Sequence, residues 1–316
     1  PWIGIYFSNI PVKLKAIAKE GYVFSHWEGV STSTEEEIIV DSAINFSVTA
    51  IFVPEGFAVE SVEPIYFWLM NSSLPNDTPI VSINSTFEVL NDGVLTFQSC
   101  LEGYPFTNAH PNWRKASMER RNSPTAINYI PEANNNIPFA SANMRGLQIK
   151  QPFQYQGLEN AMIFTFSTLG YKDIIFGFTA KDENAANAIV VDYSITEGNP
   201  VWISTDLTET SLELTSNFQL FEIDFSTISG TANNPNFKVR LRFTGPNMTI
   251  DNGDRVTFNN FSSKGVQLPL QYSTPNVFTI GTEILPLIPV VTAVADSYSI
   301  VPSLPNGLSF DESTGI

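Results

Sequence analysis

Apolar and polar residues alternate along the middle of the chain, from residue 145 to residue 265. The clearest example is the stretch 237–243, where Phe, Val, Leu and Phe occupy the odd positions and Lys or Arg the even ones. Successive side chains of a strand point to opposite faces, so this pattern indicates strands with one buried and one solvated face. It predicts seven strands: Leu147–Gln151, Ala161–Ser167, Asp173–Ala180, Ala188–Ile195, Phe218–Phe225, Phe237–Phe243 and Arg255–Phe261.

Strands at this spacing, separated by polar turns, predict a β-sandwich or barrel. Further strands are expected before them at Ile65–Met70, Ser85–Leu90 and Leu95–Cys100. Two short helices are expected, near Trp113–Arg121 and near Asp182–Asn187. The predicted fold class is therefore all-β.

The first part of the chain has a motif of its own. Residues 12–29 read VKLKAIAKEGYVFSHWEG, and SVTAIF follows at 47–52. This segment resembles the divergent InlB-type B-repeat of bacterial surface proteins, with its opening strand mostly missing. The matching residues are Gly21, Tyr22, Phe24, Trp27, Gly29, Val48, Thr49, Ala50 and Phe52. The resemblance implies a spacer or adhesion module without catalytic activity.

Two further stretches carry resemblances. The segment 255–265, RVTFNNFSSKG, is similar to the closing strand of galactose-binding-like jelly rolls. Residues 303–315, SLPNGLSFDESTG, resemble an Ig-like domain of bacterial adhesins, whose later strands are absent here. We therefore expect a small β-repeat module over residues 1–55, an antiparallel jelly-roll β-sandwich over 60–267, and a partial Ig-like β-sandwich over 268–316. The chain is then expected to be part of a larger protein.

Charge and composition limit the partners. Among 316 residues, 32 are Asp or Glu and 16 are Lys or Arg, which gives a formal net charge of −16. Phosphate backbones are repelled by such a chain, so nucleic acid is not an expected partner. No apolar run approaches the roughly 18–20 residues of a membrane span. Cys100 is the only cysteine, and we expect it to be a small buried hydrophobic residue.

The long segment 101–144 breaks the strand pattern and contains the best candidate ligand site. Trp113 is followed by a concentration of basic residues that includes Arg114, Arg120 and Arg121. One interpretation is a site for an anion or a sugar acid, in which arginine pairs with a carboxylate or sulfate. The other is that these arginines form internal ion pairs that hold the loop on the sandwich. Trp202 borders a loop and is a second candidate for sugar stacking.

Carboxylates suggest a structural calcium ion. Asp251 and Asp254 flank a Gly turn, and Asp182 with Asn184 forms a similar stretch. Calcium takes six to eight oxygen ligands, although the sequence 251–254 is also ordinary hairpin chemistry. No other cofactor is expected. The two histidines, His26 and His110, fall in different predicted modules, so no Ser–His–Asp arrangement can be proposed and the chain is not expected to be an enzyme.

These observations favour a non-catalytic binding or adhesion protein, extracellular or at a bacterial cell surface, that recognises glycans through the sandwich. The expected partners are glycans or other surface proteins, with the bacterial secretion machinery in transit. Two alternatives remain open. The modules could form a purely structural stalk, or they could be the accessory region of a secreted enzyme whose catalytic domain lies outside these residues.

Overall fold

The computed structural model describes residues 11–19, 21–29, 33, 35–40, 47–54, 61–90, 93–268, 270–272, 278–279, 281–291, 298, 300, 304–305 and 307–316. The chain divides into two compact units. One comprises Pro1–Glu60 together with Pro269–Ile316, and the other is Ser61–Leu268, called the central unit below. The division into three modules stays a prediction from the sequence.

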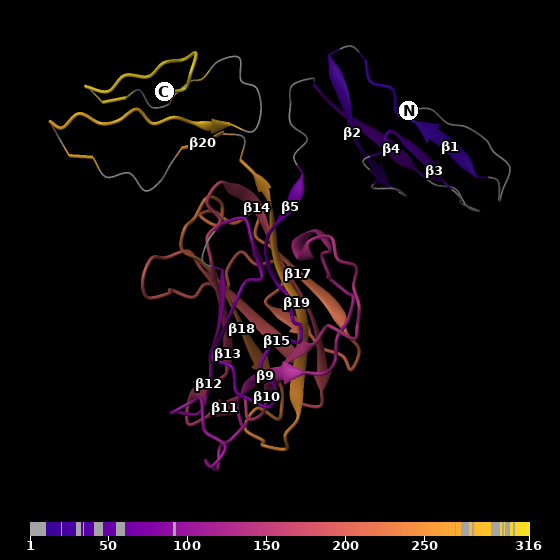
Figure 1. The fold of residues 1–316 in the computed structure, drawn as a ribbon, viewed down its shortest axis with the longest axis vertical. Helices are drawn as coiled ribbons and strands as arrows, with labels where there is room; N and C mark the ends of the chain where they lie inside the picture. Colours follow the sequence, from indigo (N-terminus) through magenta and orange to yellow (C-terminus); the bar gives the residue numbers. More distant parts are fainter. Residues whose placement is uncertain are drawn as a thin grey trace. The chain divides into compact units, whose positions relative to one another are not determined.

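The central unit is built from two antiparallel sheets (Figure 1). The seven-stranded sheet has the order β17-β14-β19-β10-β9, with β5 paired to β19 and β7 paired to β5. Its strands are β5 (Val62–Trp68), β7 (Phe87–Glu88), β9 (Met118–Arg121), β10 (Gly146–Lys150), β14 (Tyr171–Glu183), β17 (Gln219–Asp224) and β19 (Arg255–Gln267). β5 and β10 pair with different stretches of the long strand β19.

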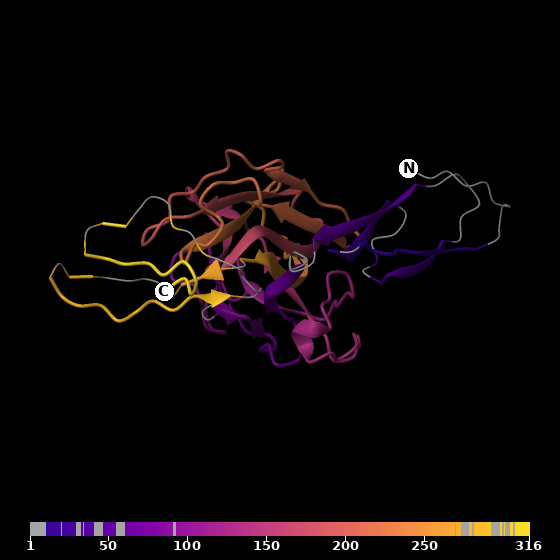
Figure 2. The same ribbon diagram turned by 90° about the horizontal axis from the view of Figure 1, so that it is seen from above.

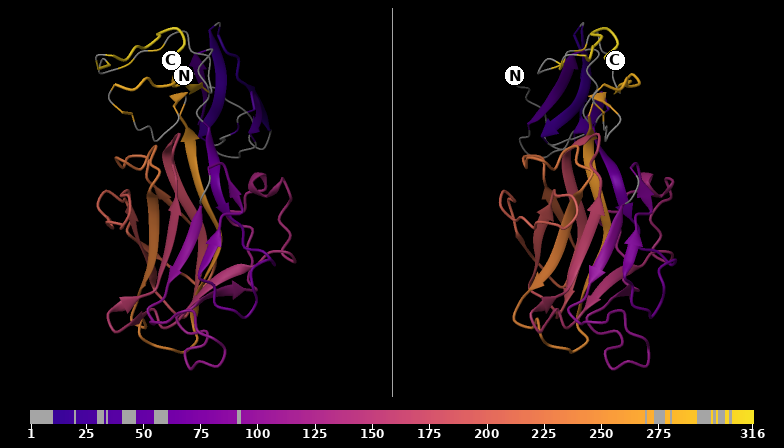
Figure 3. Two further views of the ribbon diagram at one scale, coloured as in Figure 1. Left: turned by 60° about the vertical axis from the view of Figure 1, so that its left-hand side comes forward. Right: turned by 90° about the vertical axis from the view of Figure 1, so that its left-hand side faces the viewer.

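The six-stranded sheet has the order β16-β15-β18-β13-β8-β6. Its strands are β6 (Ser82–Asn84), β8 (Val94–Gln98), β13 (Ala161–Phe166), β15 (Ala188–Ser194), β16 (Ser211–Glu213) and β18 (Phe237–Thr244). The short strands β11 (Gln154–Tyr155) and β12 (Leu158–Glu159) form a separate hairpin. The longer strands run side by side through the central unit in Figure 3.

Aromatic side chains from the inner faces of the two sheets form the core between them. Phe164 of β13 lies 4.8 Å from Phe176 of β14 and 5.2 Å from Trp68 of β5, measured between ring centroids. Phe166 of β13 contacts Phe237 of β18 at 5.3 Å. These rings are almost completely buried, and removing large apolar side chains from water is the main stabilising term in folding. The predicted all-β fold class and antiparallel sandwich are confirmed.

The strand β18 shows how directly the pattern determines the faces. Its odd positions, such as Val239 and Leu241, are fully buried in the core, while the even positions Lys238, Arg240 and Arg242 are partly exposed on the other face. The alternation read from the sequence is therefore the alternation between the inner and outer faces of the sheet.

The two predicted helices are wrong. Within the described residues the helical structure is a single 3-10 turn, η1 (Glu132–Asn134), on the outside of the central unit (Figures 1 and 2). The first predicted helix cannot form because Arg114 and Ala116 adopt positive φ angles, and 118–121 then pairs with β10 as β9. At the second, Asp182 still belongs to β14 and accepts hydrogen bonds from the amides of the turn that follows.

The stretch after β9, residues 122–144, is an ordered excursion that covers part of the outer face of the seven-stranded sheet. Side chains of that face donate hydrogen bonds to carbonyls of the segment. Asn259 donates to Ser123 (3.0 Å), and Asn260 donates to Thr125 and Ile127 (2.9 and 2.8 Å). Such bonds satisfy backbone carbonyl groups that are not paired with a neighbouring strand. The segment therefore covers the middle of this face, next to the end formed by β9 and β10.

In the residues that the structure describes, the other unit contains three two-stranded pairings. β1 (Val12–Lys15) pairs with β3 (Glu37–Val40), β2 (Tyr22–Gly29) with β4 (Val48–Pro54), and β20 (Leu270–Gln271) with β21 (Val290–Val291). Trp27 is 5% exposed and contacts Phe24, with ring centroids 5.5 Å apart, so it is a core residue of the segment that resembles a B-repeat. Ser303 and Asn306 of the Ig-like motif lie outside the described residues.

No helix in the described part of the chain combines the length and the apolar composition needed to cross a membrane.

Candidate functional site

The residues predicted to bind a ligand do not come together in one site. Arg121 lies on β9 of the seven-stranded sheet, and Trp113 and Arg114 lie in the loop before that strand. Trp202 follows β15 and stacks on Arg240 of the six-stranded sheet. Because the two sheets pack through their inner faces, these groups cannot line one site.

Two surfaces of the sandwich carry most of these residues. The β9–β10–β19 face consists of Arg114, Glu119, Arg121, Gln148, Lys150, Glu183 and Arg255. The β15–β18 face consists of Glu159, Asp192, Trp202, Arg240 and Arg242. Both are outward surfaces, because their residues alternate along the strands with core residues such as Leu147, Ile149, Val191 and Leu241.

A buried carboxylate anchors the β9–β10–β19 face. Glu119 of β9 is fully buried and accepts hydrogen bonds from Arg114 Nε (2.8 Å), Ser117 Oγ (2.7 Å) and Gln148 Nε2 (3.2 Å). Arg114 also contacts Glu119 through Nη2 (2.7 Å) and Asp77 through Nη1 (2.8 Å). The hydrogen bond to Glu119 is the main cause that raises the pKa of the Arg114 guanidinium, against the opposing effect of burial.

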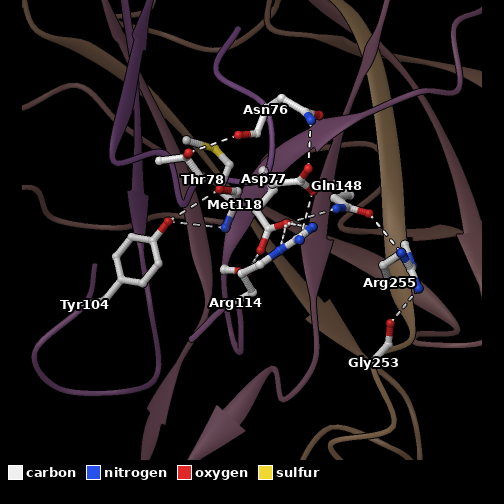
Figure 4. Close-up of polar contacts among 11 residues, drawn as sticks. Asn76, Asp77, Thr78, Tyr104, Arg114, Met118, Gln148, Gly253 and Arg255 are labelled. Carbon is white, nitrogen blue, oxygen red and sulfur yellow. Dashed lines mark hydrogen bonds and ion pairs between the residues drawn. The ribbon is translucent and has the colours of Figure 1, made fainter. Parts of the chain in front are cut away.

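The hydrogen-bond network continues from Glu119 through Gln148 to Arg255. Arg255 Nη1 donates to Gln148 Oε1 (3.1 Å), so Gln148 lies between Arg114 and Arg255 (Figure 4). Arg255 Nε is 3.4 Å from Glu183, and the same carboxylate accepts from Arg121 Nη2 at 2.9 Å. Four strands therefore contribute to one connected surface of partly exposed donors and acceptors, with its geometry fixed before any ligand arrives.

Arg120 does not belong to this surface. Its neighbours Glu119 and Arg121 lie on the outer face of β9, so Arg120 lies on the opposite side of the strand. Its Nη1 donates to the carbonyl of Leu74 at 3.0 Å. The structure thus brings Arg114 and Arg121 into one network and separates Arg120 from both. Trp113, immediately before Arg114, is half-buried.

The β15–β18 face is organised around Asp192, a buried carboxylate on β15. Arg240 donates to it through Nε and Nη2 (2.7 and 2.6 Å), and Arg242 Nη2 donates to it at 2.9 Å. Arg242 also contacts Glu159 on β12 at 3.2 Å. The guanidinium carbon of Arg240 lies 4.2 Å from the centroid of the Trp202 ring, a cation–π contact.

The structure places the predicted calcium residues in the hairpin between β18 and β19. Asp251 pairs with Lys115 at 2.8 Å, and the Asp254 carbonyl accepts from the Gln151 amide. The carboxylate of Asp182 accepts from the amides of the turn after it. Among the described residues no group of three or more His, Cys, Asp or Glu side chains is arranged to hold a metal ion. Calcium here stays a prediction from the sequence.

Sequence reasoning missed the residues that hold each face together. Glu119 and Asp192 are buried carboxylates, and the residues next to them in the sequence do not indicate their burial. Gln148 and Lys150 lie in a strand whose alternation of apolar and polar residues is ordinary. The one available signal was in β18, where basic residues at alternate positions need carboxylate partners on the neighbouring strand. That signal pointed to Arg240 and Arg242.

No family model matches this sequence, and no curated protein matches it either. Solved structures show a distant similarity. The enzymatically active domain of a bacteriophage CBA120 tailspike protein has a TM-score of 0.31 at 9% identity, with 56% of this chain and 19% of that chain covered. A cleaved adhesin domain of Lys-gingipain has a TM-score of 0.30 at 9% identity, covering 62% and 97%. A family 11 carbohydrate-binding module from Clostridium thermocellum, in complex with a mixed-linked tetrasaccharide, has a TM-score of 0.25 at 16% identity, covering 40% and 78%. At TM-scores this low, these similarities carry no information about the ligand of this chain.

Proposed function

We propose that the central unit is a non-catalytic glycan-binding sandwich of an extracellular or cell-surface bacterial protein, and that it binds through the β15–β18 face. The observation that carries the proposal is the fixed position of Trp202. Its indole ring rests on the guanidinium of Arg240, 4.2 Å from the ring centroid, and Asp192 holds that guanidinium through two hydrogen bonds.

This arrangement has the chemistry that sugar recognition requires. A pyranose ring presents an apolar C–H face that packs on an aromatic side chain, while its hydroxyl groups need charged or polar partners in fixed positions. Trp202 is half-buried and keeps part of its surface in solvent. Arg242 and Glu159 have side chains that are 25% and 33% exposed and can reach ligand hydroxyls.

Pre-ordering makes this face a better candidate than a flexible loop. A side chain that must be immobilised on binding costs roughly 0.5–1.5 kcal/mol of entropy. Here the ion pairs among Asp192, Arg240 and Arg242 already restrict the side chains before a ligand arrives. The segments that resemble a B-repeat and an adhesin Ig-like domain support the extracellular part of the proposal, and other surface proteins remain a second class of partner.

The test is a glycan array probed with the labelled full chain, followed by calorimetric titration of the best oligosaccharide. Trp202→Ala is the test variant and Trp113→Ala is the matched control, because Trp113 is also half-buried and lies in the loop before β9, outside the β15–β18 face. We expect Trp202→Ala to weaken binding by about tenfold, since one aromatic contact contributes roughly 0.5–1.5 kcal/mol beyond its buried area. Trp113→Ala should leave binding unchanged.

Two results would overturn the proposal. One is that the full chain binds none of the arrayed glycans, which would favour a purely structural spacer. The other is that Trp202→Ala binds as tightly as the unaltered chain. Loss of binding in Trp113→Ala alone would move the glycan site to the loop before β9.

A further inference from the structure

The β9–β10–β19 face contains a lysine that has no counter-ion among the described residues. Lys150 is the last residue of β10 and is half-buried on the same side of the strand as Gln148. In the parts of the chain that the structure describes, its ammonium has no carboxylate within ion-pairing distance and no hydrogen-bond acceptor. A partly desolvated charge that lacks a partner is unfavourable in a folded protein.

The charges around Lys150 differ in sign. Burial is the main cause that lowers the pKa of its ammonium, the positive charges of Arg114 and Arg255 lower it further, and Glu119 and Asp251 raise it. Arg255 lies opposite Lys150 in the pairing of β10 with β19, and Arg114 is joined through Glu119 to Gln148, two residues before Lys150 on the same side of β10. Both nearby carboxylates already have other cationic partners, since Glu119 pairs with Arg114 and Asp251 with Lys115.

The ion pairs of this face leave an excess of positive charge. Four carboxylates are paired there: Asp77, Glu119, Glu183 and Asp251. Their partners are five cations: Arg114, Lys115, Arg121, Lys181 and Arg255. Lys150 adds a sixth cation, so these groups comprise six cations and four carboxylates in a chain whose net charge is −16.

We propose that Lys150, together with Arg114 and Arg255, binds an oxyanion of an acidic glycan, either the carboxylate of a uronic acid or a sulfate ester. Charged donors form the strongest hydrogen bonds to such groups, and the planar guanidinium adds directional N–H donors beside the ammonium. The glycan part rests on the proposed function, whereas the oxyanion site itself does not. It lies on the sheet opposite the β15–β18 face and does not need Trp202.

The experiment measures binding to the full chain at constant ionic strength by calorimetric titration. The probes are a trigalacturonate, a sulfated oligosaccharide, a neutral oligosaccharide of matched length, and inorganic sulfate. Lys150→Gln removes the unpaired charge. Lys264→Gln is the matched control, because Lys264 lies on β19 of the same sheet and is paired with Glu222 at 3.6 Å.

We expect at least one anionic oligosaccharide to bind about tenfold more tightly than the neutral one, because hydrogen bonds between charged donors and acceptors are stronger than those between neutral groups. Lys150→Gln should lose that advantage, and Lys264→Gln and Trp202→Ala should both keep it. Lys150→Gln should also melt no lower than the unaltered chain, since it breaks no ion pair of the described residues and removes a partly desolvated charge.

Three outcomes contradict the proposal. Equal affinity for anionic and neutral oligosaccharides overturns it, and so does an anionic preference that survives Lys150→Gln. If neutral glycans still bind through Trp202 in either case, the proposed function of the β15–β18 face holds and the oxyanion site does not. If inorganic sulfate binds while both anionic oligosaccharides do not, the assignment to a glycan is overturned. Comparison of the two anionic probes decides between a uronate and a sulfate ester.

Discussion

Replacing Arg114 tests whether a buried ion pair holds the β9–β10–β19 face together. Glu119 is fully buried, and among the described residues that hydrogen-bond to it Arg114 is the charged one. In Arg114→Ala the carboxylate keeps Ser117 and Gln148 but loses its counter-ion. Removing one partner of a buried pair costs about 3–5 kcal/mol, because the other charge stays buried without compensation. We expect a loss of about 3 kcal/mol, since Arg114 itself is 29% exposed and solvent reaches part of the pair.

The measurement is urea unfolding of the full chain with linear extrapolation, followed by thermal melts. For a domain of this size, 1 kcal/mol shifts the melting temperature by roughly 2–4 °C, so Arg114→Ala should melt about 6–12 °C lower. Arg121→Ala is the matched control. Its partner Glu183 is 20% exposed and keeps Lys181 and Arg255, so the loss should stay within about 1 kcal/mol.

A double variant separates the lost charge from the lost packing. Adding Glu119→Gln to Arg114→Ala removes the stranded negative charge and should restore at least about 1 kcal/mol of stability. The reasoning is refuted if Arg114→Ala is no less stable than Arg121→Ala, or if the double variant recovers nothing. Arg114 would then be held mainly by its exposed contact with Asp77.

Three other predictions concern Trp27, Cys100 and the turn that contains Asp251 and Asp254. Trp27→Ala should lower the stability of the segment 11–54 by about 3–5 kcal/mol, because Trp27 is a core residue there. Limited proteolysis of the full chain should therefore cut the variant sooner within this segment, and equal cleavage rates would place Trp27 outside a stabilising core. Burial raises the pKa of the Cys100 thiol to about 12, so almost no thiolate exists at about pH 8. Iodoacetamide should therefore label Cys100 only after denaturation, and rapid labelling of the folded chain would contradict this. If calcium binds at Asp251 and Asp254, adding it after EDTA should raise the melting temperature, because a ligand that binds only the folded state stabilises it; an unchanged melt would leave the turn without the ion.

The sequence predicted the all-β sandwich because a two-residue period is a local property. In β18, each apolar residue is buried and each basic residue lies outside, as the alternation requires. The stretch Met118–Arg121 shows where local reasoning fails. Its residues favour a helix as readily as a strand, and what decides is pairing with β10, about thirty residues later in the chain. Pairing with a strand that is distant in sequence overrides the secondary-structure propensity of these residues.

The candidate faces were harder to predict because they depend on the register between strands. Glu119 lies opposite Gln148, and Lys150 opposite Arg255, only through the pairing of β9, β10 and β19. A shift of one residue would turn each of these side chains into the core. The sequence identified Arg114, Arg121 and Trp202 as candidates by residue type. It could not show that Trp202 belongs to the opposite sheet.

The charge of the chain limits what the β9–β10–β19 face can bind. With a net charge of −16, the protein repels anions at long range, but at physiological ionic strength this field is screened within about 8 Å. Contacts closer than that depend on the local surplus of cations around Lys150. A phosphate backbone must be neutralised at many positions, and a surplus of two charges cannot do so. One carboxylate or sulfate needs only one such cluster, which is why an acidic sugar suits this face better than a nucleic acid.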